Sequence, residues 1–491
     1  MIEGSHPILT CDEARSWEAG LFAGDEAKEW AAMQRAGRAI GAAVWRDFAE
    51  IGGFPARGKL LVLVGKGHNG GDALIAAMDI LERCPEASAE VVFVFGERAL
   101  RPLARRAWQD FSGGAGKFRL RTASPTDAFE GDYALCLDGI FGFQFRPPVD
   151  GPTRALIEQV NAAAIRFRAA VDLPSAGLLR ADFTYATGAV KEPALTGECA
   201  GRVRYLDLGF FRAPKEGSRR VLTSGVLAPL AGFRPPRSDK RTYGHVFVLG
   251  GSRTYPGAVL MAVLAALRSG VGLVTAFVPE TLVPAFAAQV PEAIWVGWPE
   301  TADGGLALEG EYLLRARIDW ATAFVIGPGV GREAETLALI ANVVRTVTVP
   351  VLLDADALQA ETVRAAKTSL VLTPHAGEFA RISTGATLEK VADESGAVVV
   401  LKGPITKVAA KGVVYHSCFG GPVLARGGSG DVLAGLIGGL MAQSPDDLPR
   451  AAARGVVWHG LAADLLAREQ GQVAARTTEL IDRLPMALRA V

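Results

Sequence analysis

Residues 59–74 read KLLVLVGKGHNGGDAL, in which a short apolar run ends at Gly65 and a glycine-rich loop leads into a helical stretch. An apolar run of this length, closed by glycine, is typical of a buried strand. Similar runs recur at residues 90–95, 133–137 and 169–173, with helical stretches between them. Strand, glycine turn, helix and strand in succession predict a parallel sheet that is covered by helices on both faces.

The same pattern starts again in the second half of the chain, after amphipathic helical spacing at residues 10–50 in the first. Apolar runs that suit strands occupy residues 245–249, 273–278, 323–326, 349–353, 370–372 and 398–401. Between the halves, residues 211–241 contain FRAPKEGSRR and FRPPRSDKR, which are rich in proline, glycine and charge, as linkers are. We therefore expect an α/β protein of two doubly wound, three-layer domains, residues 1–222 and 223–491.

The composition excludes several classes of protein. The chain has 491 residues with 52 basic and 52 acidic side chains, and this balance gives no attraction to nucleic acid or to an anionic membrane. Its five cysteines form no CxxC pair, which excludes a disulfide framework and a zinc site. The longest apolar stretch, residues 258–267, is far shorter than the roughly 18 residues that span a bilayer, and no signal segment precedes it. We expect a soluble, cytoplasmic protein with small-molecule partners.

The glycine-rich loop at residues 65–74 has two interpretations. Because it follows a strand and opens a helix, its free N–H groups and the helix dipole could cradle an anion or a phosphate; a plain tight turn is the alternative. The loop lacks the pattern of a dinucleotide fingerprint and that of a Walker loop. Asp138 and Asp172 end two of the predicted strands, where an open parallel sheet places ligand-binding groups, although each could instead cap a helix.

These loops together carry a resemblance. GKGHNGGDAL (65–74), DGIFGFQFRPP (138–148) and VDLPS (171–175) look like the three signature loops of the NAD(P)H-hydrate epimerase family, in the same order. The N-terminal stretches ILTCDEARSWEAG and AMQRAGRAI also resemble that family's first helices. The resemblance implies a Rossmann-like pocket for the hydrated nicotinamide cofactor, with a potassium ion nearby.

Residue by residue, the resemblance implies catalysis by Asp172 and substrate contacts from two loops. The implied contacts are His68, Asn69, Gly70, Gly71, Asp72, Gly142, Phe143, Gln144, Phe145, Arg146, Pro147 and Pro148. The resemblance also implies K⁺ ligation by Asn69, Asp138 and Ser175, whose amide, carboxylate and hydroxyl oxygens suit a hard cation.

The first half departs from the family pattern at four places. His68 stands where the family has Asn, Ala73 stands where it has Gly, and GFQF (142–145) replaces a glycine-threonine-glycine turn. Ser175 is followed by Ala176, with a shortened loop before residues 181–184. Two bulky phenylalanines in that turn could fill space that small residues leave for substrate. A non-catalytic binding or oligomerisation module is therefore the alternative for this half.

In the second half, residues 426–435 read RGGSGDVLAG, a small-residue turn with Asp431 at the start of a long apolar helix. Backbone N–H groups of such a turn could bind transferring phosphate oxygens, and Asp431 is placed to take a proton from an attacking hydroxyl. This is the anion-hole logic of ribokinase-like enzymes. Taken alone, the motif could also be a capped helix.

Seven further motifs accompany this one. They are GGS (250–252), YPGA (255–258), AALRSGVGLV (265–274), GPGVG (327–331), DADAL (354–358), TPHAGEF (373–379) and KGPIT (402–406). In this order they closely resemble the ADP-dependent NAD(P)H-hydrate dehydratase family, which implies a ribokinase-like fold with ADP as co-substrate and Mg²⁺. The implied hydrate contacts are Ala258, Gly329, Gly331, His375 and Asp431, and the implied nucleotide contacts are Lys402, Gly403, Pro404, Ile405, Thr406 and Gly430. Asp354 and Asp356 are either structural or close to the Mg²⁺.

The two resemblances together predict a bifunctional repair enzyme for NADH and NADPH hydrates. One half would interconvert the R and S hydrates, and the other would dehydrate the S form to NAD(P)H at the expense of ADP, giving AMP and phosphate. Asp431 is the expected catalytic group of the second half. A ribokinase-type small-molecule kinase is the alternative, since it would use the same aspartate but keep the phosphate on its product. We expect a homo-oligomer.

Overall fold

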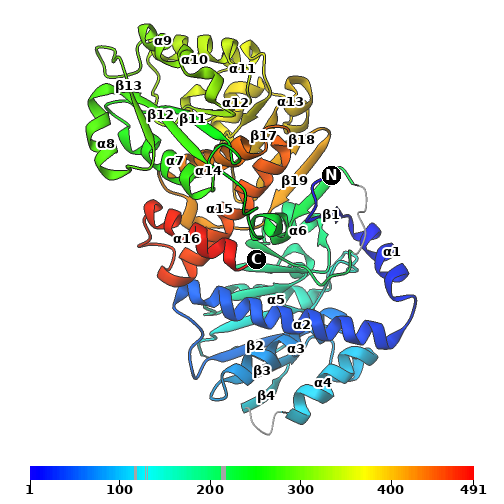
Figure 1. Cartoon of the computed structure of the whole chain (residues 1–491). Helices are drawn as coiled ribbons and strands as arrows, with labels where there is room; N and C mark the ends of the chain where they lie inside the picture. The colour runs from blue at the N-terminus through cyan, green and yellow to red at the C-terminus, as the bar shows by residue number, and fades with distance from the viewer. Residues whose placement is uncertain (115–118, 128, 130, 212–216) are drawn as a thin grey trace. The chain divides into compact units, whose positions relative to one another are not determined.

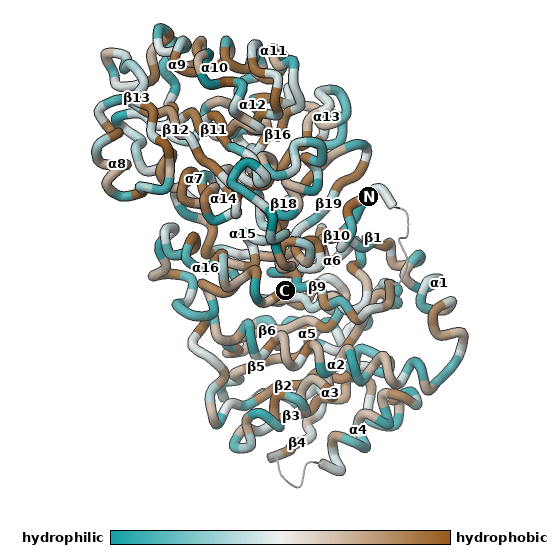
Figure 2. Tube along the Cα trace, viewed as in Figure 1, coloured by the Kyte–Doolittle hydropathy of each residue, from teal (hydrophilic) through white to brown (hydrophobic). Residues whose placement is uncertain are grey.

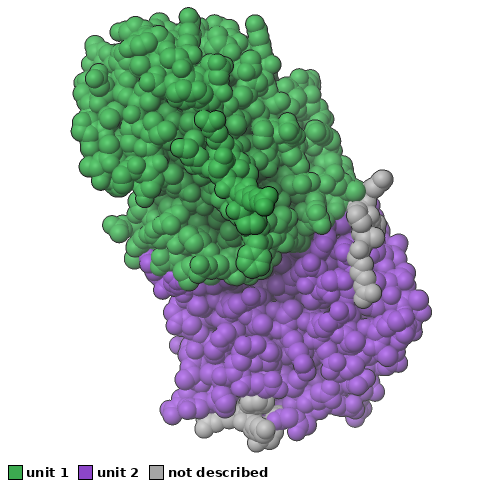
Figure 3. Space-filling view, viewed as in Figure 1, with its two compact units in different colours: residues 1–5, 217–466, 473–491 green, residues 6–216, 467–472 purple. Residues whose placement is uncertain are grey.

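The computed structural model describes residues 1–114, 119–127, 129, 131–211 and 217–491 (Figure 1). Two compact units make up the chain (Figure 3): the N-terminal unit, residues 6–216 and 467–472, and the C-terminal unit, residues 1–5, 217–466 and 473–491. The division of two activities between residues 1–222 and 223–491 stays a prediction. None of the helices in the described residues is long and apolar enough to cross a bilayer.

The N-terminal unit contains a parallel sheet. Its strand order is β4 (Arg119–Ala123), β3 (Ser88–Phe93), β2 (Lys59–Val64), β5 (Leu135–Gly139), β6 (Arg168–Val171), β7 (Phe183–Thr187) and β9 (Arg202–Leu206). Two further strands, β1 (Ser5–Leu9) and β8 (Val190–Lys191), pair in parallel with each other. The continuous apolar runs of the sequence are the central strands of this sheet, as buried parallel strands require.

Helices cover both faces of this sheet, because successive side chains of a strand point to opposite faces. Leu60, Val62 and Val64 share a core with α2 (Glu26–Phe48), α3 (His68–Arg83) and α4 (Pro102–Gly114). Leu61 and Leu63 share the other core with α5 (Gly151–Ala162). Ahead of these helices, α1 (Cys11–Phe22) starts at a capping box formed by Thr10 and Glu13.

The C-terminal unit repeats this plan with a different ending. Its strand order is β13 (Ile294–Trp298), β12 (Leu273–Pro279), β11 (His245–Leu249), β14 (Ala323–Ile326), β15 (Val351–Leu353), β16 (Leu370–Leu372), β17 (Val398–Leu401), β18 (Thr406–Ala410), β19 (Val413–Ser417) and β10 (Arg219–Leu222). The pairs from β13 to β17 are parallel, whereas β17–β18 and β18–β19 are antiparallel. The central strands of both units are apolar along most of their length (Figure 2).

Helices again lie on both faces. Phe247 and Leu249 pack in a core with α10 (Ala334–Thr346). On the opposite face, α14 (Ser429–Gln443) places Gly438 directly against the side chain of Val325. One further helix, α6 (Glu192–Thr196), lies in the N-terminal unit. The other helices of the described residues are α7 (Pro256–Arg268), α8 (Val283–Gln289), α9 (Glu311–Arg315), α11 (Ala360–Ala365), α12 (Ala376–Ser383), α13 (Leu388–Ser395), α15 (Leu448–Gln470) and α16 (Thr477–Arg489).

The expected α/β class with two doubly wound units is confirmed, and the differences concern edges and the expected linker. The strand predicted at residues 90–95 begins at Ser88, and the strand predicted at 133–137 occupies Leu135–Gly139. Residues 211–241 are not linker throughout, because they contain β10, which pairs with β19. Residues 212–216 of that stretch lie outside the described residues.

Candidate functional site

Each sheet reverses its strand order at one point where predicted site residues gather. The reversal lies between β2 and β5 in the N-terminal unit and between β11 and β14 in the C-terminal unit. An open parallel sheet forms a ligand crevice beyond the carboxyl ends of the strands at such a point. The loops approach closely there: a Cβ at Gly65 would collide with the Ile140 carbonyl, and a Cβ at Gly250 would collide with the Pro328 carbonyl.

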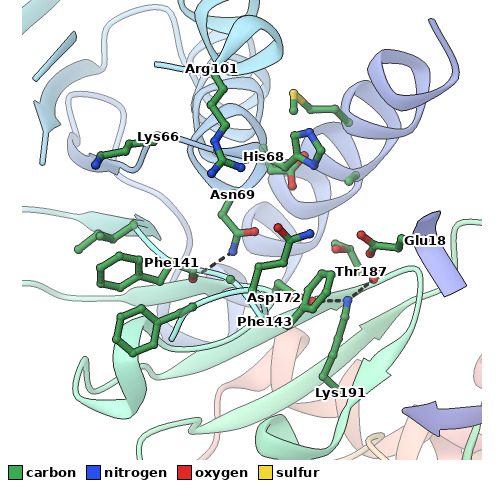
Figure 4. A pocket seen from close by; sticks show the side chains of 18 of the residues that line it. Glu18, Lys66, His68, Asn69, Arg101, Phe141, Phe143, Asp172, Thr187 and Lys191 are labelled. Atoms are coloured by element: carbon green, nitrogen blue, oxygen red, sulfur yellow. Dashed lines mark hydrogen bonds and ion pairs between the residues drawn. The ribbon is translucent and has the colours of Figure 1, made fainter. Parts of the chain in front are cut away.

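A pocket of about 470 Å³ lies at the reversal in the N-terminal unit (Figure 4). Predicted residues that line it are His68, Asn69, Asp72, Gly142, Phe143, Gln144, Phe145, Arg146, Pro148 and Asp172. Gly70, Gly71 and Pro147 are not among its lining residues. Gly70 and Gly71 lie in α3, where a Cβ would collide with Gly65 and with Met33 respectively, so these two glycines allow the helix to pack closely.

Asn69, Ser175 and Asp138 are linked through the backbone of Phe141. The Asn69 amide donates to the carbonyls of Val171, at 2.8 Å, and Phe141, at 3.2 Å. The Phe141 N–H donates to Ser175 Oγ at 3.0 Å, and Ser175 Oγ donates to Asp138 Oδ1 at 2.5 Å. The structure therefore brings the three predicted K⁺ ligands into one hydrogen-bonded chain.

The carboxyl group of Asp138 is completely buried, and this burial raises its pKa to about 6, although hydrogen bonds from Ser175 oppose the shift. It does not cap a helix: its oxygens accept from Ser175 and from the Ile140 N–H. The Asn69 amide oxygen faces Gly142, where there is no room for a side chain. The oxygen donors present suit K⁺ in chemistry.

Asp172 forms a buried ion pair with Lys191. The distance from Lys191 Nζ to Asp172 Oδ1 is 2.6 Å, and the two side chains are 2% and 5% exposed. Lys191 also donates to the Thr187 carbonyl at 3.1 Å and lies 5.1 Å from the centre of the Phe143 ring. Asp172 has a backbone φ of +67°, a conformation that costs a non-glycine residue about 1–2 kcal/mol and that is typical of functional sites.

Two carboxyl oxygens in this pocket are buried without a hydrogen-bond partner among the described residues. They are Asp172 Oδ2 and Asp72 Oδ1. Burial raises the pKa of Asp72 well above its usual range, and the nearby Asp172 and Glu18 carboxyls add to this shift. An unpartnered buried polar group is costly, so these oxygens are suited to a ligand that brings its own hydrogen-bond donors.

Aromatic and charged side chains form the rest of the pocket wall. Phe141 and Phe145 pack with ring centroids 4.4 Å apart, and Phe143 is only 8% exposed. The GFQF turn therefore narrows the pocket without closing it. Arg146 pairs with Asp12 at 2.9 Å, and burial lowers the pKa of His68 although Glu29 lies nearby.

Sequence reasoning missed six charged residues of this pocket, which are Glu18, Glu29, Lys66, Arg101, Asp150 and Lys191. Glu18 belongs to the N-terminal stretch that resembles the epimerase family, so a signal existed for it. Lys191 lies in none of the sequence motifs. Only the folded structure shows that its ammonium group reaches Asp172.

In the C-terminal unit, the structure brings Ala258 and Gly329 together. A Cβ at Gly329 would lie 3.0 Å from that of Ala258 and would also collide with the Tyr255 carbonyl. Ser252 Oγ donates to the Gly329 carbonyl at 2.8 Å. Gly331 differs, since its φ is +74° but nothing lies near the position of a Cβ, so the structure does not place it against another site residue.

Lys402 lies close to two carboxylate groups at this crevice. Its Nζ donates to Asp354 Oδ1 at 2.9 Å and lies 3.7 Å from Glu378 Oε2. Burial opposes its charge, but Asp354 and Glu378 outweigh burial and raise the pKa of Lys402. Thr373 also donates to Asp354, at 2.7 Å, so this aspartate is not a helix cap. Asp356 pairs instead with Arg332 at 2.8 Å.

His375 caps α12 with its ring. Its Nδ1 accepts hydrogen bonds from the N–H groups of Gly377, at 3.0 Å, and Glu378, at 3.3 Å. The side chain is 61% exposed. Its Nε2 lies 3.4 Å from Glu378 Oε1. The predicted nucleotide contacts Gly403, Pro404, Ile405 and Thr406 form the turn from β17 into β18, next to Lys402.

Asp431 lies in the first turn of α14. The preceding Gly428 has a φ of +88° and offers no side-chain cap to the first N–H groups of the helix. A Cβ at Gly430 would lie 3.2 Å from Lys402 Nζ. Burial and the nearby Asp354 raise the pKa of Asp431 to about 7, although Lys402 opposes this shift. A carboxyl group with this pKa can accept a proton near neutral pH.

No three His, Cys, Asp or Glu side chains in the described part of the chain cluster in a way that could hold a metal ion. Mg²⁺ usually binds through substrate phosphates and water, with one or two carboxylates.

The chain matches known proteins over nearly its whole length. A family model described as NAD(P)H-hydrate dehydratase matches residues 246–486, and one described as YjeF-related protein N-terminus matches residues 30–198. The chain is 34% identical to the bifunctional NAD(P)H-hydrate repair enzyme Nnr of Moorella thermoacetica, covering 93% of this chain and 92% of that protein. It is 36% identical to the protein of the same name from Gloeobacter violaceus, with 94% and 93% covered.

Among solved structures, the C-terminal part is similar to an ADP/ATP-dependent NAD(P)H-hydrate dehydratase from Bacillus subtilis that was co-crystallised with ATP and Mg²⁺. The sequences are 31% identical, and the match covers 54% of this chain and 96% of that one with a TM-score of 0.47.

Proposed function

The chain belongs to the family of bifunctional NAD(P)H-hydrate repair enzymes, and on that premise we propose how its two crevices divide the work. The family activities are epimerisation of the hydrates and their ADP-dependent dehydration. We assign epimerisation to the pocket beside Asp172 and dehydration to the crevice beside Asp431. The observation that supports this division most strongly is Asp431, with its pKa of about 7, at the start of α14, where no side chain caps the helix.

Dehydration needs a better leaving group than hydroxide. In the hydrate, a hydroxyl stands on the ring carbon next to nitrogen. Asp431 takes the proton of that hydroxyl while the hydroxyl oxygen attacks the terminal phosphate of ADP. This gives AMP and a phosphorylated hydrate. The ring nitrogen then expels phosphate and restores the dihydronicotinamide. The N–H groups from Gly428 to Gly430 and the Lys402 ammonium stabilise the transferring phosphoryl group, and Mg²⁺, when bound with the nucleotide, neutralises phosphate charge.

Epimerisation breaks the same carbon–oxygen bond reversibly. The ring-nitrogen lone pair displaces the hydroxyl, and water returns to either face of the ring. Asp172, held by Lys191, presents its unpartnered Oδ2 to the pocket, where it suits the reacting hydroxyl. We place K⁺ at Asn69, Asp138 and Ser175, whose oxygen donors support this choice.

The remaining parts of the proposal concern the state of the protein. All five cysteines are free thiols, which fits a reducing cytoplasm. We propose a homo-oligomer, which light scattering on the purified chain tests directly.

One experiment tests the division of activities and its alternatives. The purified chain is given both NADH hydrate epimers with Mg²⁺, K⁺ and either ADP or ATP, while chromatography follows each epimer and absorbance follows NADH. We expect nucleotide-dependent loss of both epimers, with the second lost faster than it converts spontaneously. Loss of one epimer alone would make the N-terminal unit a binding module, and a stable phosphorylated product without NADH would favour a kinase.

A further inference from the structure

Glu18 is a third carboxyl group at the Asp172–Lys191 pair, and it comes from a different element. It lies on α1 and lines the pocket together with Asp172, Lys191 and Asp72 (Figure 4). None of the motifs in the sequence assigns it a role.

The pocket beside Glu18 is prepared for a ligand with polar hydrogens. Asp72 and Asp172 are 8% and 3% exposed, and each keeps one buried oxygen without a hydrogen-bond partner in the part of the chain that the structure describes. A carboxyl cluster that satisfied only the fold would have these oxygens paired. A hydroxyl on the ligand, together with water, would satisfy them.

The charges around Glu18 differ from those around its neighbours. It faces Glu29 from α2, Asp72 from α3, Asp172 from the loop after β6 and Lys191 from β8. Burial raises the pKa of Glu18 to about 7; Lys191 opposes this shift, whereas Asp172 and Glu29 add to it. Burial raises the pKa of Asp72 well above its usual range, and Lys191 is paired with Asp172. Glu18 is therefore the group that can change its protonation state at neutral pH.

We propose that Glu18 is the general acid–base group of the epimerase pocket and works opposite Asp172 on the reacting hydroxyl of the hydrate. This inference rests on the proposed epimerisation at this pocket. It assigns two carboxyl groups with different environments to the two proton transfers that the reaction requires, as acid–base enzymes commonly do.

Glu18 gives its proton to the leaving hydroxyl, the carbon–oxygen bond breaks with its electron pair on oxygen, and water departs while the nitrogen lone pair forms a C=N bond. Water then adds to the other face of that carbon, one of its protons passes to Asp172, and the C=N electrons return to nitrogen. The proton now on Asp172 returns to Glu18, so no oxidant, reductant or further reactant is consumed.

The test uses the full chain carrying Glu18→Gln or Glu18→Asp. Pure S hydrate is incubated without nucleotide, and appearance of the R epimer is followed by chromatography from pH 5.5 to 8.5. General acid–base catalysis contributes about 10²–10⁴-fold, so we expect Glu18→Gln to lose epimerisation by at least about 10²-fold and to lose the wild-type pH dependence near 7. Glu18→Asp should recover part of the rate with a displaced profile.

Two controls separate the possible failures. Glu26→Gln removes an exposed carboxylate from the first turn of α2, away from the pocket, and should epimerise like the wild type, while ADP-dependent dehydration and circular dichroism report folding. If Glu18→Gln keeps the wild-type rate and pH profile, the role of Glu18 is wrong although the pocket is an epimerase. If the wild type does not exceed spontaneous exchange, the proposed epimerisation itself fails.

Discussion

The two crevices share a plan but present different groups to a ligand. Each lies where strand order reverses, and each holds a lysine–aspartate pair: Lys191 with Asp172 at 2.6 Å, and Lys402 with Asp354 at 2.9 Å. In the N-terminal pocket both partners are buried, whereas Lys402 is 21% exposed and lies next to the exposed ring of His375.

The surroundings of each pair determine which chemistry it supports. The first pair shares its pocket with the Glu18 and Asp72 carboxyl groups, whose pKa values are raised by burial, and this suits reversible opening of a carbon–oxygen bond. The second pair lies beside the start of α14, where an N-terminus without a side-chain cap and Asp431 suit phosphoryl transfer. The lysine–aspartate pair is therefore common to both sites, at the point where strand order reverses. The neighbouring carboxyl and N–H groups determine which reaction each site supports.

The Asp431→Asn substitution distinguishes the activities of the two crevices most clearly. Because the amide cannot accept the hydroxyl proton, we expect dehydration to fall about 10³-fold, while nucleotide binding and epimerisation stay close to wild type. Steady-state NADH formation and a nucleotide titration by calorimetry measure the two parts. A variant with near-normal turnover would contradict the role of Asp431 as base.

Replacing each lysine by methionine tests whether the two pairs are equivalent. Removing one partner of a buried ion pair costs about 3–5 kcal/mol, so Lys191→Met should lower the unfolding temperature of the chain more than Lys402→Met, whose ammonium is partly exposed. Differential scanning calorimetry measures both. The double variant Lys191→Met with Asp172→Leu serves as the control and should recover much of the stability but none of the epimerisation. Equal stability of the single and double variants would show that the pair is not what holds this region.

The sequence predicted the central features of both crevices and missed their edges and pairings. The central strands are continuous apolar runs, so they were visible, whereas the edge strands β4 (RLRTA) and β9 (RVRYL) alternate with arginine and were not. Glycine loops and Asp431 were visible because their chemistry lies within a few consecutive residues. The partners Lys191 and Asp354 were not assigned their roles, because an ion pair between residues 19 or 48 positions apart depends on how strands return to the sheet.

The pH dependence distinguishes the two reactions. Asp431 must be ionised to act as base, and its pKa of about 7 means that the dehydration rate rises with pH, by about tenfold per unit well below 7, and levels off above it. Epimerisation begins with Glu18 protonated, and its pKa of about 7 means that the epimerisation rate is level well below pH 7 and falls above it. Profiles of kcat/KM from pH 5.5 to 8.5 check both.

In Asp354→Asn, the loss of a neighbouring negative charge should lower the pKa of Asp431 and move the dehydration profile to lower pH. An unmoved profile would contradict the coupling between Asp354 and Asp431.

The smallest expected effect is a change in stability, for which Gly331 is compared with Gly67. A Cβ added at either glycine would have no other atom near it. Gly331 has a φ of +74°, so Gly331→Ala strains the backbone although space is available; such a conformation costs about 1–2 kcal/mol. Gly67 has a φ of −106° and precedes α3, so Gly67→Ser adds a favourable N-cap hydroxyl without strain. We expect the first change to lower the unfolding temperature by a few degrees and the second to leave it unchanged or raise it. If both variants unfold alike, open space rather than backbone conformation decides which residues these loops accept.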